Sequence, residues 1–396
     1  MKKYGLIVVG AGAAGLTAAA CAARLGKSVL VIDKNAEPAR KIYVSGGGKC
    51  NFSNRFVNAG RYLSANPHFC KSALAGLTPD AVLKRLTDAR VGWEEREDGK
   101  LFAFSGESIR RFVLNEARAA GAELLTGATL FDLRKPDDFR LSCSAGEFSA
   151  DAVLIATGGK SCPALGATGI GYSLAEKFGV KVVPPEPALV SLKLAAGTSP
   201  DLTGLAGLSL PVKIRTGKYE RIGDLLFTPD AVSGPAVLQT SLRWNAGDAV
   251  EIDFLPSSDL TAVLKSRRAA KEKRHLAAVL SELMPSRLAS RFAGIVAGDL
   301  PLSAVSDKTF AKLEQTVKRF RFTPPSTGGW AKAEVTKGGV DVNGLFSATM
   351  ESRSVSGLYF AGEVVDVTGE VGGFNLHWAW ASGTVAGKAA GTRQTP

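Results

Sequence analysis

The sequence is poor in the residues that build metal centres and disulfide frameworks. Its 396 residues include three histidines and five cysteines, which is an odd number, and no two cysteines are spaced as CxxC. A disulfide-stapled fold, a structural zinc site and a histidine-rich metal centre are therefore not expected. This cysteine usage fits a reducing, cytoplasmic compartment, and we predict no metal ligands.

Long uncharged runs are also scarce, and the main one covers residues 4–23. It follows Lys2 and Lys3, so it resembles a signal peptide, and its length approaches that of a short membrane span. Glycines at positions 5, 10, 12 and 15 interrupt the run, and a second apolar run, Ser28–Asp33, follows at once. A strand, a turn, a helix and a second strand account for the whole stretch, so we expect no membrane span.

The overall composition is that of a globular protein. Hydrophobic residues make up 45% and charged residues 22%, which argues against disorder. The formal net charge is +12. Such a charge permits an anionic partner, which could be a nucleotide cofactor, a nucleic acid or a membrane surface, without choosing among them.

The pattern along the chain indicates a nucleotide-binding domain that is divided by an insertion. Prolines at 184–187 and 324–325, the latter followed by Gly328 and Gly329, break the chain. We predict an α/β fold with domain segments 1–187, 188–326 and 327–396. The expected helices are 13–25, 79–90, 107–120, two or more within 259–293, 307–319 and 375–390. The expected strands are 6–9, 28–32, four short ones within 123–156, then 188–196, 208–216, 250–255 and 357–362.

The most specific motif is Gly10-Ala-Gly12-Ala-Ala-Gly15. It follows a predicted strand, opens a helix, and is followed by Asp33 at the end of the next strand. This context is typical of dinucleotide binding. Gly10 allows the tight turn, Gly12 lets the backbone approach a pyrophosphate, and Gly15 permits close packing of helix on strand. The helix N-terminus favours phosphate.

Three further segments suit a flat, phosphate-bearing ligand. The loop 40–51 contains three consecutive glycines beside Ser45, Lys49 and Asn51. Thr157, Gly158 and Gly159 end an apolar strand, and Glu363 ends the last strand. Gly372 and Gly373 open the last helix, whose N-terminus could stabilise the charge of a reduced flavin ring.

These segments resemble the FAD-binding family that includes aminoacetone oxidase and 3-dehydro-bile-acid reductase. The resemblance covers nearly the whole chain and is most specific at 40–54, 100–106, 233–236 and 362–383. It implies a two-dinucleotide-binding-type flavoprotein fold with a mixed β/α insert domain over the flavin. It also implies FAD contacts at Gly10, Gly12, Gly15, Asp33, Ser45, Gly46, Gly47, Asn51, Thr157, Gly158, Glu363, Gly373 and Asn375. The full predicted set adds Ala13, Ala14, Lys34, Lys41, Lys49, Leu130, Gly159, Gly362, Gly372, Phe374 and Leu376.

The resulting prediction is an FAD-dependent oxidoreductase that passes a hydride through flavin N5. The expected partners are a small organic substrate or O2, with NAD(P)H as a transient co-substrate, since a second complete βαβ fingerprint is absent from the sequence. His377, where the family often has Gln, is the candidate proton donor; a histidine packed among aromatic residues is the alternative. Cys50 is a weaker candidate for a reactive thiol. Phe227–Asp230 departs from the family's Thr-His, so the substrate could differ from that of relatives.

Two other functions stay open. Lys265–Arg274 carries six cations in ten residues and could contact nucleic acid, as in FAD proteins that modify tRNA. It lacks interleaved aromatic residues, so a solvated helix face is the favoured interpretation and a nucleic-acid partner is not expected. The third alternative is a flavin-binding protein without catalysis.

Overall fold

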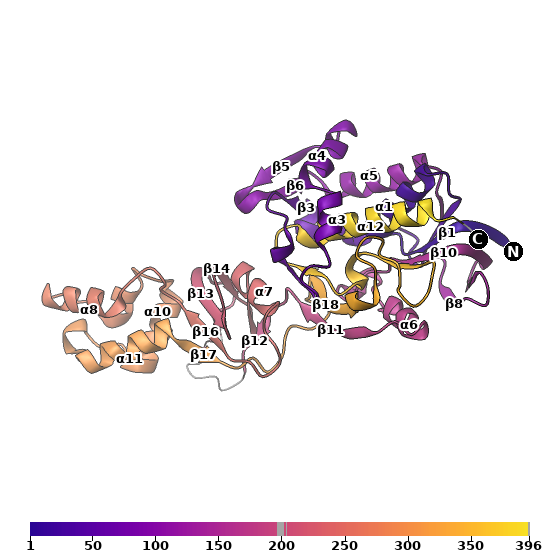
Figure 1. The fold of residues 1–396 in the computed structure, drawn as a ribbon. Helices are drawn as coiled ribbons and strands as arrows, with labels where there is room; N and C mark the ends of the chain where they lie inside the picture. Colours follow the sequence, from indigo (N-terminus) through magenta and orange to yellow (C-terminus); the bar gives the residue numbers. More distant parts are fainter. Residues whose placement is uncertain (196–201, 203, 395–396) are drawn as a thin grey trace. The chain divides into compact units, whose positions relative to one another are not determined.

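The computed structural model describes residues 1–195, 202 and 204–394, and the chain forms two compact units (Figure 1). Unit 1 comprises Met1–Pro187 and Glu334–Pro396, and unit 2 comprises Ala188–Ala333. The predicted domain boundaries are 187/188 and 326/327, so the two divisions differ at the second one. Residues 327–333 belong with unit 2 because Thr327 bridges Leu192 and the Gly328 N–H donates to the Ser191 carbonyl.

Unit 1 is built on a mixed sheet whose centre is parallel. The strand order is β7-β2-β1-β10-β9-β8, and β19 pairs with the end of β10. Val8 lies between Val31 and Leu154, and all three side chains are buried, as expected for parallel strands covered on both faces. The strands are β1 (Lys2–Val9), β2 (Val29–Asp33), β7 (Glu123–Thr126), β8 (Leu130–Arg134), β9 (Phe139–Cys143), β10 (Gly146–Ile155) and β19 (Leu358–Phe360).

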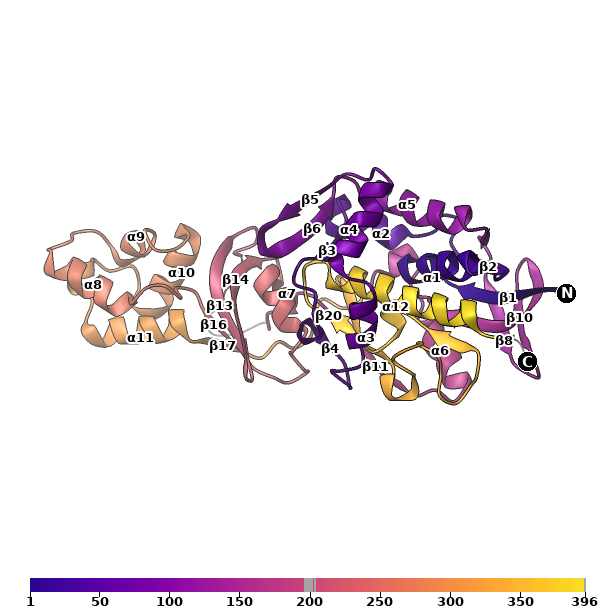
Figure 2. The ribbon, with the colours of Figure 1, turned by 45° about the horizontal axis from the view of Figure 1, so that its top comes forward.

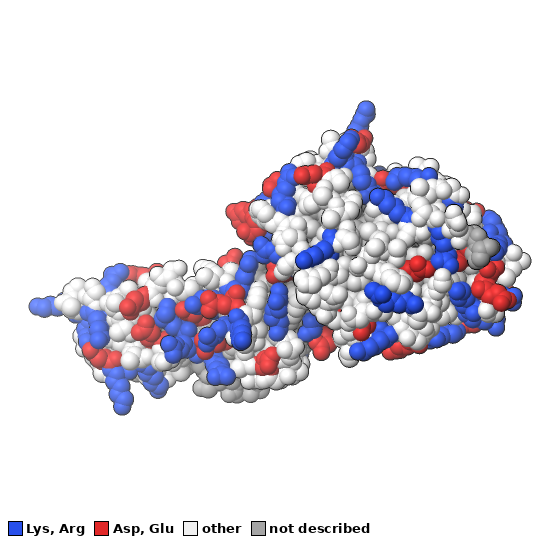
Figure 3. Space-filling view, viewed as in Figure 1, with Lys and Arg blue, Asp and Glu red and all other residues white. Residues whose placement is uncertain are grey.

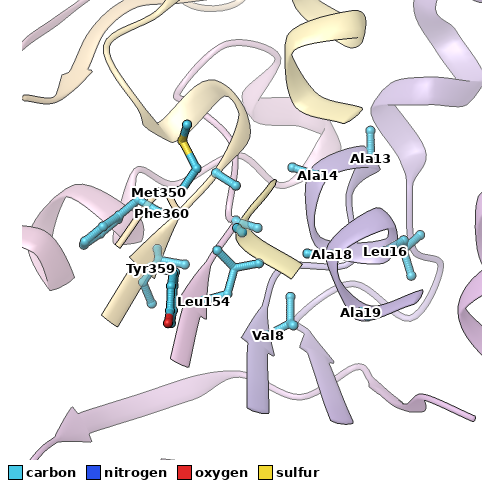
Figure 4. Close-up of a cluster of buried hydrophobic side chains, with 14 of the residues drawn as sticks. Val8, Ala13, Ala14, Leu16, Ala18, Ala19, Leu154, Met350, Tyr359 and Phe360 are labelled. Carbon is cyan, nitrogen blue, oxygen red and sulfur yellow. The ribbon is translucent and has the colours of Figure 1, made fainter. Parts of the chain in front are cut away.

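The first and last long helices of unit 1 pack against each other through small residues. They are α1 (Ala13–Arg24) and α12 (Phe374–Thr392), and they lie side by side in Figures 1 and 2. A Cβ atom added at Gly387 would lie 2.3 Å from the Ala18 carbonyl oxygen, and one added at Gly383 would lie 2.4 Å from that of Ala14. The N-terminal and C-terminal segments of the chain therefore pack against each other through this helix pair, over the same sheet. Figure 4 shows the buried cluster beneath, with Val8, Leu16, Leu154 and Phe360.

Smaller elements complete unit 1, including a three-stranded antiparallel sheet in the order β3-β6-β5. They are α2 (Arg40–Val44), β3 (Asn51–Asn54), β4 (Tyr62–Leu63), α3 (Lys71–Gly76), α4 (Pro79–Asp88), β5 (Trp93–Arg96), β6 (Lys100–Ala103), α5 (Gly106–Ala119), α6 (Ile170–Lys177), β11 (Val182–Ala188), β18 (Val335–Val340) and β20 (Thr368–Gly369). Residues 184–187, where the sequence predicts a break, lie at the end of the first segment of unit 1. They lie within β11, which pairs with β18 in a two-stranded sheet where proline is tolerated at the edge.

Unit 2 combines an antiparallel sheet, in the order β12-β15-β14-β13-β16-β17, with helices. Phe254 is central to its core, with the rings of Phe227, Phe292 and Phe320 at centroid distances of 6.2, 5.5 and 5.7 Å. The elements are β12 (Leu192–Lys193), β13 (Ser209–Thr216), β14 (Tyr219–Phe227), β15 (Ala231–Ser233), α7 (Pro235–Ser241), β16 (Val250–Asp253), α8 (Leu260–Ala269), α9 (Leu276–Leu280), α10 (Ser286–Val296), α11 (Asp307–Lys318) and β17 (Phe320–Phe322).

The strand predicted over 188–196 is shorter than expected, and residue 196 lies outside the described residues. Within the described part of the chain, no helix is long and apolar enough to cross a bilayer. The same residues include no group of His, Cys, Asp and Glu that could hold a metal ion.

Candidate cofactor site

The turn between β1 and α1 presents a helix N-terminus to open space. The Gly10 N–H donates to the Ile32 carbonyl at 2.8 Å, and a Cβ atom at Gly15 would lie 1.9 Å from the Gly10 oxygen. Gly12 is the N-cap of the helix that begins with Ala13 and Ala14. Its surroundings differ from the crowded ones of Gly10 and Gly15. A Cβ atom at Gly12 would meet no atom of the described chain within 4 Å. The turn is thus tight on its inner side and open where a phosphate would approach.

Asp33 holds this turn in place. Its carboxylate accepts hydrogen bonds from the Ala11 N–H at 2.7 Å and the Asn35 N–H at 2.8 Å. The neighbouring Lys34 is exposed, and Leu130 begins β8 opposite Cys143. Within the described residues, no hydrogen bond or ion pair joins the side chain of Lys34 to the other predicted ligands.

The glycine loop after α2 is a second open stretch of backbone. Gly46, Gly47 and Gly48 have φ angles of 57°, 67° and 86°, a region that favours glycine. Within the described structure, a Cβ atom on Gly47 or Gly48 would contact nothing within 4 Å. Ser45 closes the loop, because its Oγ donates to the Ile42 carbonyl at 2.8 Å. The exposed Lys49 follows.

The start of α12 meets this region through two asparagines. The Asn51 amide is oriented so that its nitrogen donates to carbonyl groups, and its oxygen then accepts a hydrogen bond from the Gly373 N–H at 3.1 Å. Asn375 Oδ1 accepts from the Gly369 N–H at 2.8 Å, and its Nδ2 donates to the Gly369 carbonyl at 2.8 Å. Gly372 and Gly373 have φ angles of 118° and 93°. Phe374 is buried and Leu376 is half-buried beyond them.

Glu363, just after β19, lies in a network of short polar contacts. Its carboxylate accepts from Lys41 Nζ and Ser161 Oγ, each at 2.7 Å, and from the Thr336 N–H at 2.9 Å. Lys41 also donates to Ser161 Oγ at 2.6 Å. Burial alone would raise the pKa of Glu363, but the charge and hydrogen bonds of Lys41, with those of Ser161 and Thr336, lower it below its usual value. Glu363 is therefore ionised at neutral pH.

The end of β10 offers a third open stretch. The Thr157 Oγ1 is buried and has no hydrogen-bond partner among the described residues, and a Cβ at Gly158 would find open space there. Gly159 instead packs tightly, with its Cβ position 2.2 Å from Thr336 Oγ1. Gly362 similarly abuts α1, with its Cβ position 2.8 Å from the Ala14 Cβ.

These features fit a long, flat ligand with a pyrophosphate, as FAD is. They comprise open backbone at Gly12, Gly47 and Gly158, an orphaned buried hydroxyl at Thr157, and helix N-termini at α1 and α12. Residues 4–389 match the family model described as the HI0933-like protein Rossmann domain. This chain belongs to the HI0933-like family. It is accordingly an FAD-dependent oxidoreductase, which confirms the predicted fold class, FAD as the cofactor and the enzyme class.

Three relatives are similar to this chain over nearly its whole length. It is 40% identical over 389 residues to the ribosomal RNA dihydrouridine synthase of Escherichia coli K12, covering 96% of each chain. It is 41% identical to the ribosomal RNA dihydrouridine synthase of Haemophilus influenzae, covering 95% of this chain and 96% of the relative. It is 30% identical to the 3-dehydro-bile acid delta(4,6)-reductase of Clostridium scindens, covering 99% and 100%.

Solved structures show the same fold at low identity. A flavocytochrome c3 fumarate reductase in an open conformation matches with a TM-score of 0.51 and 17% identity, covering 98% of this chain and 78% of that one. A 3-ketosteroid-delta4-(5alpha)-dehydrogenase from Rhodococcus jostii matches with a TM-score of 0.50 and 15% identity, covering 99% and 97%. Both likenesses concern the fold alone.

His377 occupies a structural position in this HI0933-like chain. Its side chain is fully buried, its Nδ1 lies 2.8 Å from Ser53 Oγ, and its Nε2 lies 2.9 Å from the Leu77 carbonyl oxygen. Nε2 therefore carries the hydrogen, and Nδ1 accepts from the serine. Burial lowers the pKa of His377 to about 4, against the opposing effect of the Leu77 bond. Both ring nitrogens are thus bonded to protein groups, an arrangement that disfavours His377 as a proton donor.

Cys50 is similarly unsuited to chemistry. Its side chain is buried, and burial raises its pKa to about 12, with the Ser45 hydrogen bond opposing. Thiolate, the reactive form, is therefore scarce at neutral pH.

The basic segment 265–274 differs from the predicted helix face. Helix α8 ends at Ala269, so the segment spans a helix end and the turn after it. Arg267 pairs with Glu282 at 2.6 Å, and Lys265 and Arg268 both pair with Asp307. Figure 3 shows cations projecting at this end of unit 2, beside acidic side chains.

Two members of the Glu363 network were missed from the sequence. Ser161 lies four residues after Thr157 in the same loop, so the strand-end motif could have been extended to include it. Thr336 belongs to no motif of the sequence and is distant from Ser161 along the chain. Its hydroxyl accepts from the Lys160 and Ser161 N–H groups at 2.8 and 3.2 Å. Such a contact depends on tertiary pairing and leaves no local signal.

Proposed function

We propose that this protein reduces uridine to dihydrouridine in ribosomal RNA. The observation that carries the proposal is the full-length identity of 40% and 41% to two proteins named ribosomal RNA dihydrouridine synthase. The sequence by itself favoured a small organic substrate or O2 and set nucleic acid aside; these relatives favour the nucleic-acid alternative. An rRNA substrate agrees with the cytoplasmic compartment that the cysteine usage suggests.

The proposed reaction saturates the C5=C6 bond of uracil, which is conjugated to the C4 carbonyl. One carbon receives a hydride and the other receives a proton, and the bound FAD supplies the hydride from its N5 position. NADH or NADPH is the proposed source of the two electrons. The reaction thus balances as one nicotinamide oxidised for each uridine reduced.

The chain's own residues supply binding and electrostatics. We assign the cofactor pyrophosphate to the N-terminus of α1 at Gly12, because it is open and has no competing side-chain cap. The open glycines Gly47 and Gly48 and the α12 N-terminus at Gly373 are assigned to the flavin ring. Glu363, held ionised by Lys41, is assigned to hydroxyl groups of the cofactor, because a carboxylate readily accepts hydrogen bonds from hydroxyl groups.

A second candidate is the reduction of a conjugated ketone, supported by the 30% identity to a 3-dehydro-bile acid reductase across essentially the full length of both chains. A dienone and a uracil ring both present a C=C bond conjugated to a carbonyl. The same flavin chemistry therefore serves either substrate, and the surface beside the flavin decides between them.

The test supplies both substrates to the same FAD-loaded protein. Ribosomal RNA from a strain that lacks dihydrouridine in its rRNA is incubated with the protein and NADH or NADPH, then digested and analysed by nucleoside mass spectrometry. Dihydrouridine should accumulate with one of the two nicotinamides, and a Gly12→Val variant should give none. Reduction of a 3-keto-dienone steroid without any dihydrouridine in the rRNA would favour the second candidate.

A further inference from the structure

One face of the small sheet β3-β6-β5 carries aromatic rings that rest on glycines. Along β6 and just after it, Leu101 and Ala103 are fully buried, whereas Phe102 and Phe104 alternate with them and face outward. A Cβ atom at Gly92 would lie 2.6 Å from the Phe104 ring, and one at Gly46 would lie 2.9 Å from the Phe102 ring. Phe104 is nevertheless 64% exposed. Its inner side is supported by backbone while much of the ring is open to solvent.

Cations and acids both lie beside these rings. The Arg96 guanidinium lies 4.1 Å from the centroid of Phe102, and Lys100 lies opposite Arg96 in the strand register. Lys49 is exposed, and its charge helps to lower the pKa of Glu94, after the larger effect of the Arg96 hydrogen bond. Four acids lie in the same hairpin: Glu94 is bonded to Arg96, Glu95 is bonded to Arg55, Asp98 lies 3.3 Å from Lys100, and Glu97 is exposed. We call Lys49, Arg96, Lys100, Phe102 and Phe104 the aromatic face.

The aromatic face is continuous with loops assigned to the flavin. Gly46 lies under Phe102, and Asn51, paired with Phe102 between β3 and β6, accepts from the Gly373 N–H. A Cβ atom at Gly372 would lie 3.6 Å from the Lys100 side chain. All of these contacts are within unit 1. A base stacked on this face would therefore lie beside the backbone that holds the cofactor.

We infer that the aromatic face binds single-stranded RNA next to the uridine that is reduced. The inference rests on the proposed function and names the surface that would hold its substrate. Aromatic rings stack on bases of any sequence, and neighbouring Lys and Arg contact phosphates. Exposed phenylalanine on a folded surface is otherwise unfavourable, and here its position on glycine makes a flat platform. A small ketone would not require such an extended surface.

The experiment measures affinity for a short fluorescein-labelled single-stranded oligouridylate by fluorescence anisotropy, using the FAD-loaded full chain. Phe104→Ala should weaken binding about tenfold, the loss of one stacked base. The matched control is Phe131→Ala on β8, since Phe131 is 69% exposed but lies on the edge of the main sheet. It should bind as the wild-type chain does. Flavin absorbance and thermal unfolding verify that each variant is folded and loaded.

The same variants are then assayed for dihydrouridine in rRNA, which separates the two proposals. Loss of oligouridylate binding in Phe104→Ala, with no dihydrouridine formed even by the wild-type chain, supports the aromatic face and rejects the proposed reaction. Dihydrouridine formed equally by wild-type and Phe104→Ala chains, with equal Kd values, overturns the aromatic face and keeps the reaction. Undetectable oligouridylate binding by the wild-type chain also overturns it.

Discussion

At the scale of single residues, two glycines of one motif have opposite surroundings. Gly15 has the Gly10 oxygen 1.9 Å from where its Cβ would be, whereas the described chain leaves open space around the Cβ position of Gly12. The Gly12 backbone, with φ −86° and ψ −171°, is also one that any residue adopts. Gly15 is thus required by the fold, and Gly12 by whatever occupies the space in front of it.

Gly12→Val should therefore fold normally and lose FAD. We expect the Kd for FAD to rise on the order of 100-fold or more, because the side chain would fill the space assigned to the pyrophosphate. Flavin absorbance of the purified chain and titration with FAD measure this. Gly15→Ala provides the contrast, with reduced thermal stability whether or not FAD is added. A Gly12→Val chain that purifies fully yellow would contradict the assignment.

His377 gives a second prediction, on stability rather than catalysis. Its folded-state pKa of about 4 lies below the usual 6.5, so the unfolded chain binds the extra proton first as the pH falls. As the pH falls from 6.5 to about 4, His377 therefore lowers the free energy of unfolding by about 3 kcal/mol in total.

His377→Gln should remove that pH-dependent loss and leave the pH profile of turnover unchanged. Denaturant unfolding at several pH values gives the first quantity, and steady-state assays give the second. His68→Gln serves as a control, because His68 is exposed. A turnover profile that shifts in His377→Gln but not in His68→Gln would restore the proton-donor role.

At the scale of elements, the contact between α1 and α12 decides whether the two ends of the chain form one domain. Gly387→Ala would place a methyl group 2.3 Å from the Ala18 oxygen and separate the helices. We expect a loss of roughly 1–3 kcal/mol in unfolding free energy, larger than the gain from replacing a helical glycine.

The control for this change is Gly294→Ala in α10, where a Cβ atom would meet no described atom within 4 Å. The same substitution there should raise stability by about 0.5–1 kcal/mol. Denaturant unfolding followed by circular dichroism compares the two. Equal effects at both positions would show that helix propensity, and not the contact with α1, sets the outcome.

Elements with local signals could be predicted from the sequence, and those made by distant pairing could not. The strand, glycine turn and helix at the N-terminus appear as predicted, because each has its own residue pattern. The prolines at 184–187 lie where the first segment of unit 1 ends, but the strand that they also form depends on pairing with β18, some 150 residues later. In the aromatic face, Phe102 likewise rests on Gly46, which lies far from it in the sequence.

At the scale of the whole molecule, positive charge is unevenly divided. Residues 188–333 contain 20 Lys and Arg against 13 Asp and Glu, while the longer remainder contains 29 against 24. In the basic segment, Lys265, Arg267, Arg268 and Arg274 are paired with acids. Lys271 and Lys273 are exposed and have no ion pair among the described residues. These two lysines are therefore the cations of that segment most available to RNA phosphates.

Electrostatic and stacking contacts should respond differently to salt. Each phosphate contact steepens the fall of log affinity with log salt by about 0.7–0.9, whereas stacking on Phe104 leaves that slope unchanged. For rRNA, the double change Lys271→Gln and Lys273→Gln should reduce the slope by about 1.4–1.8, while Phe104→Ala lowers affinity at every salt concentration alike. Lys71→Gln with Lys388→Gln, both exposed in unit 1, makes the same change in net charge and should keep the wild-type slope. If the wild-type chain and both double variants gave one slope, the basic segment would be a solvated surface, and RNA recognition would fall to unit 1 alone.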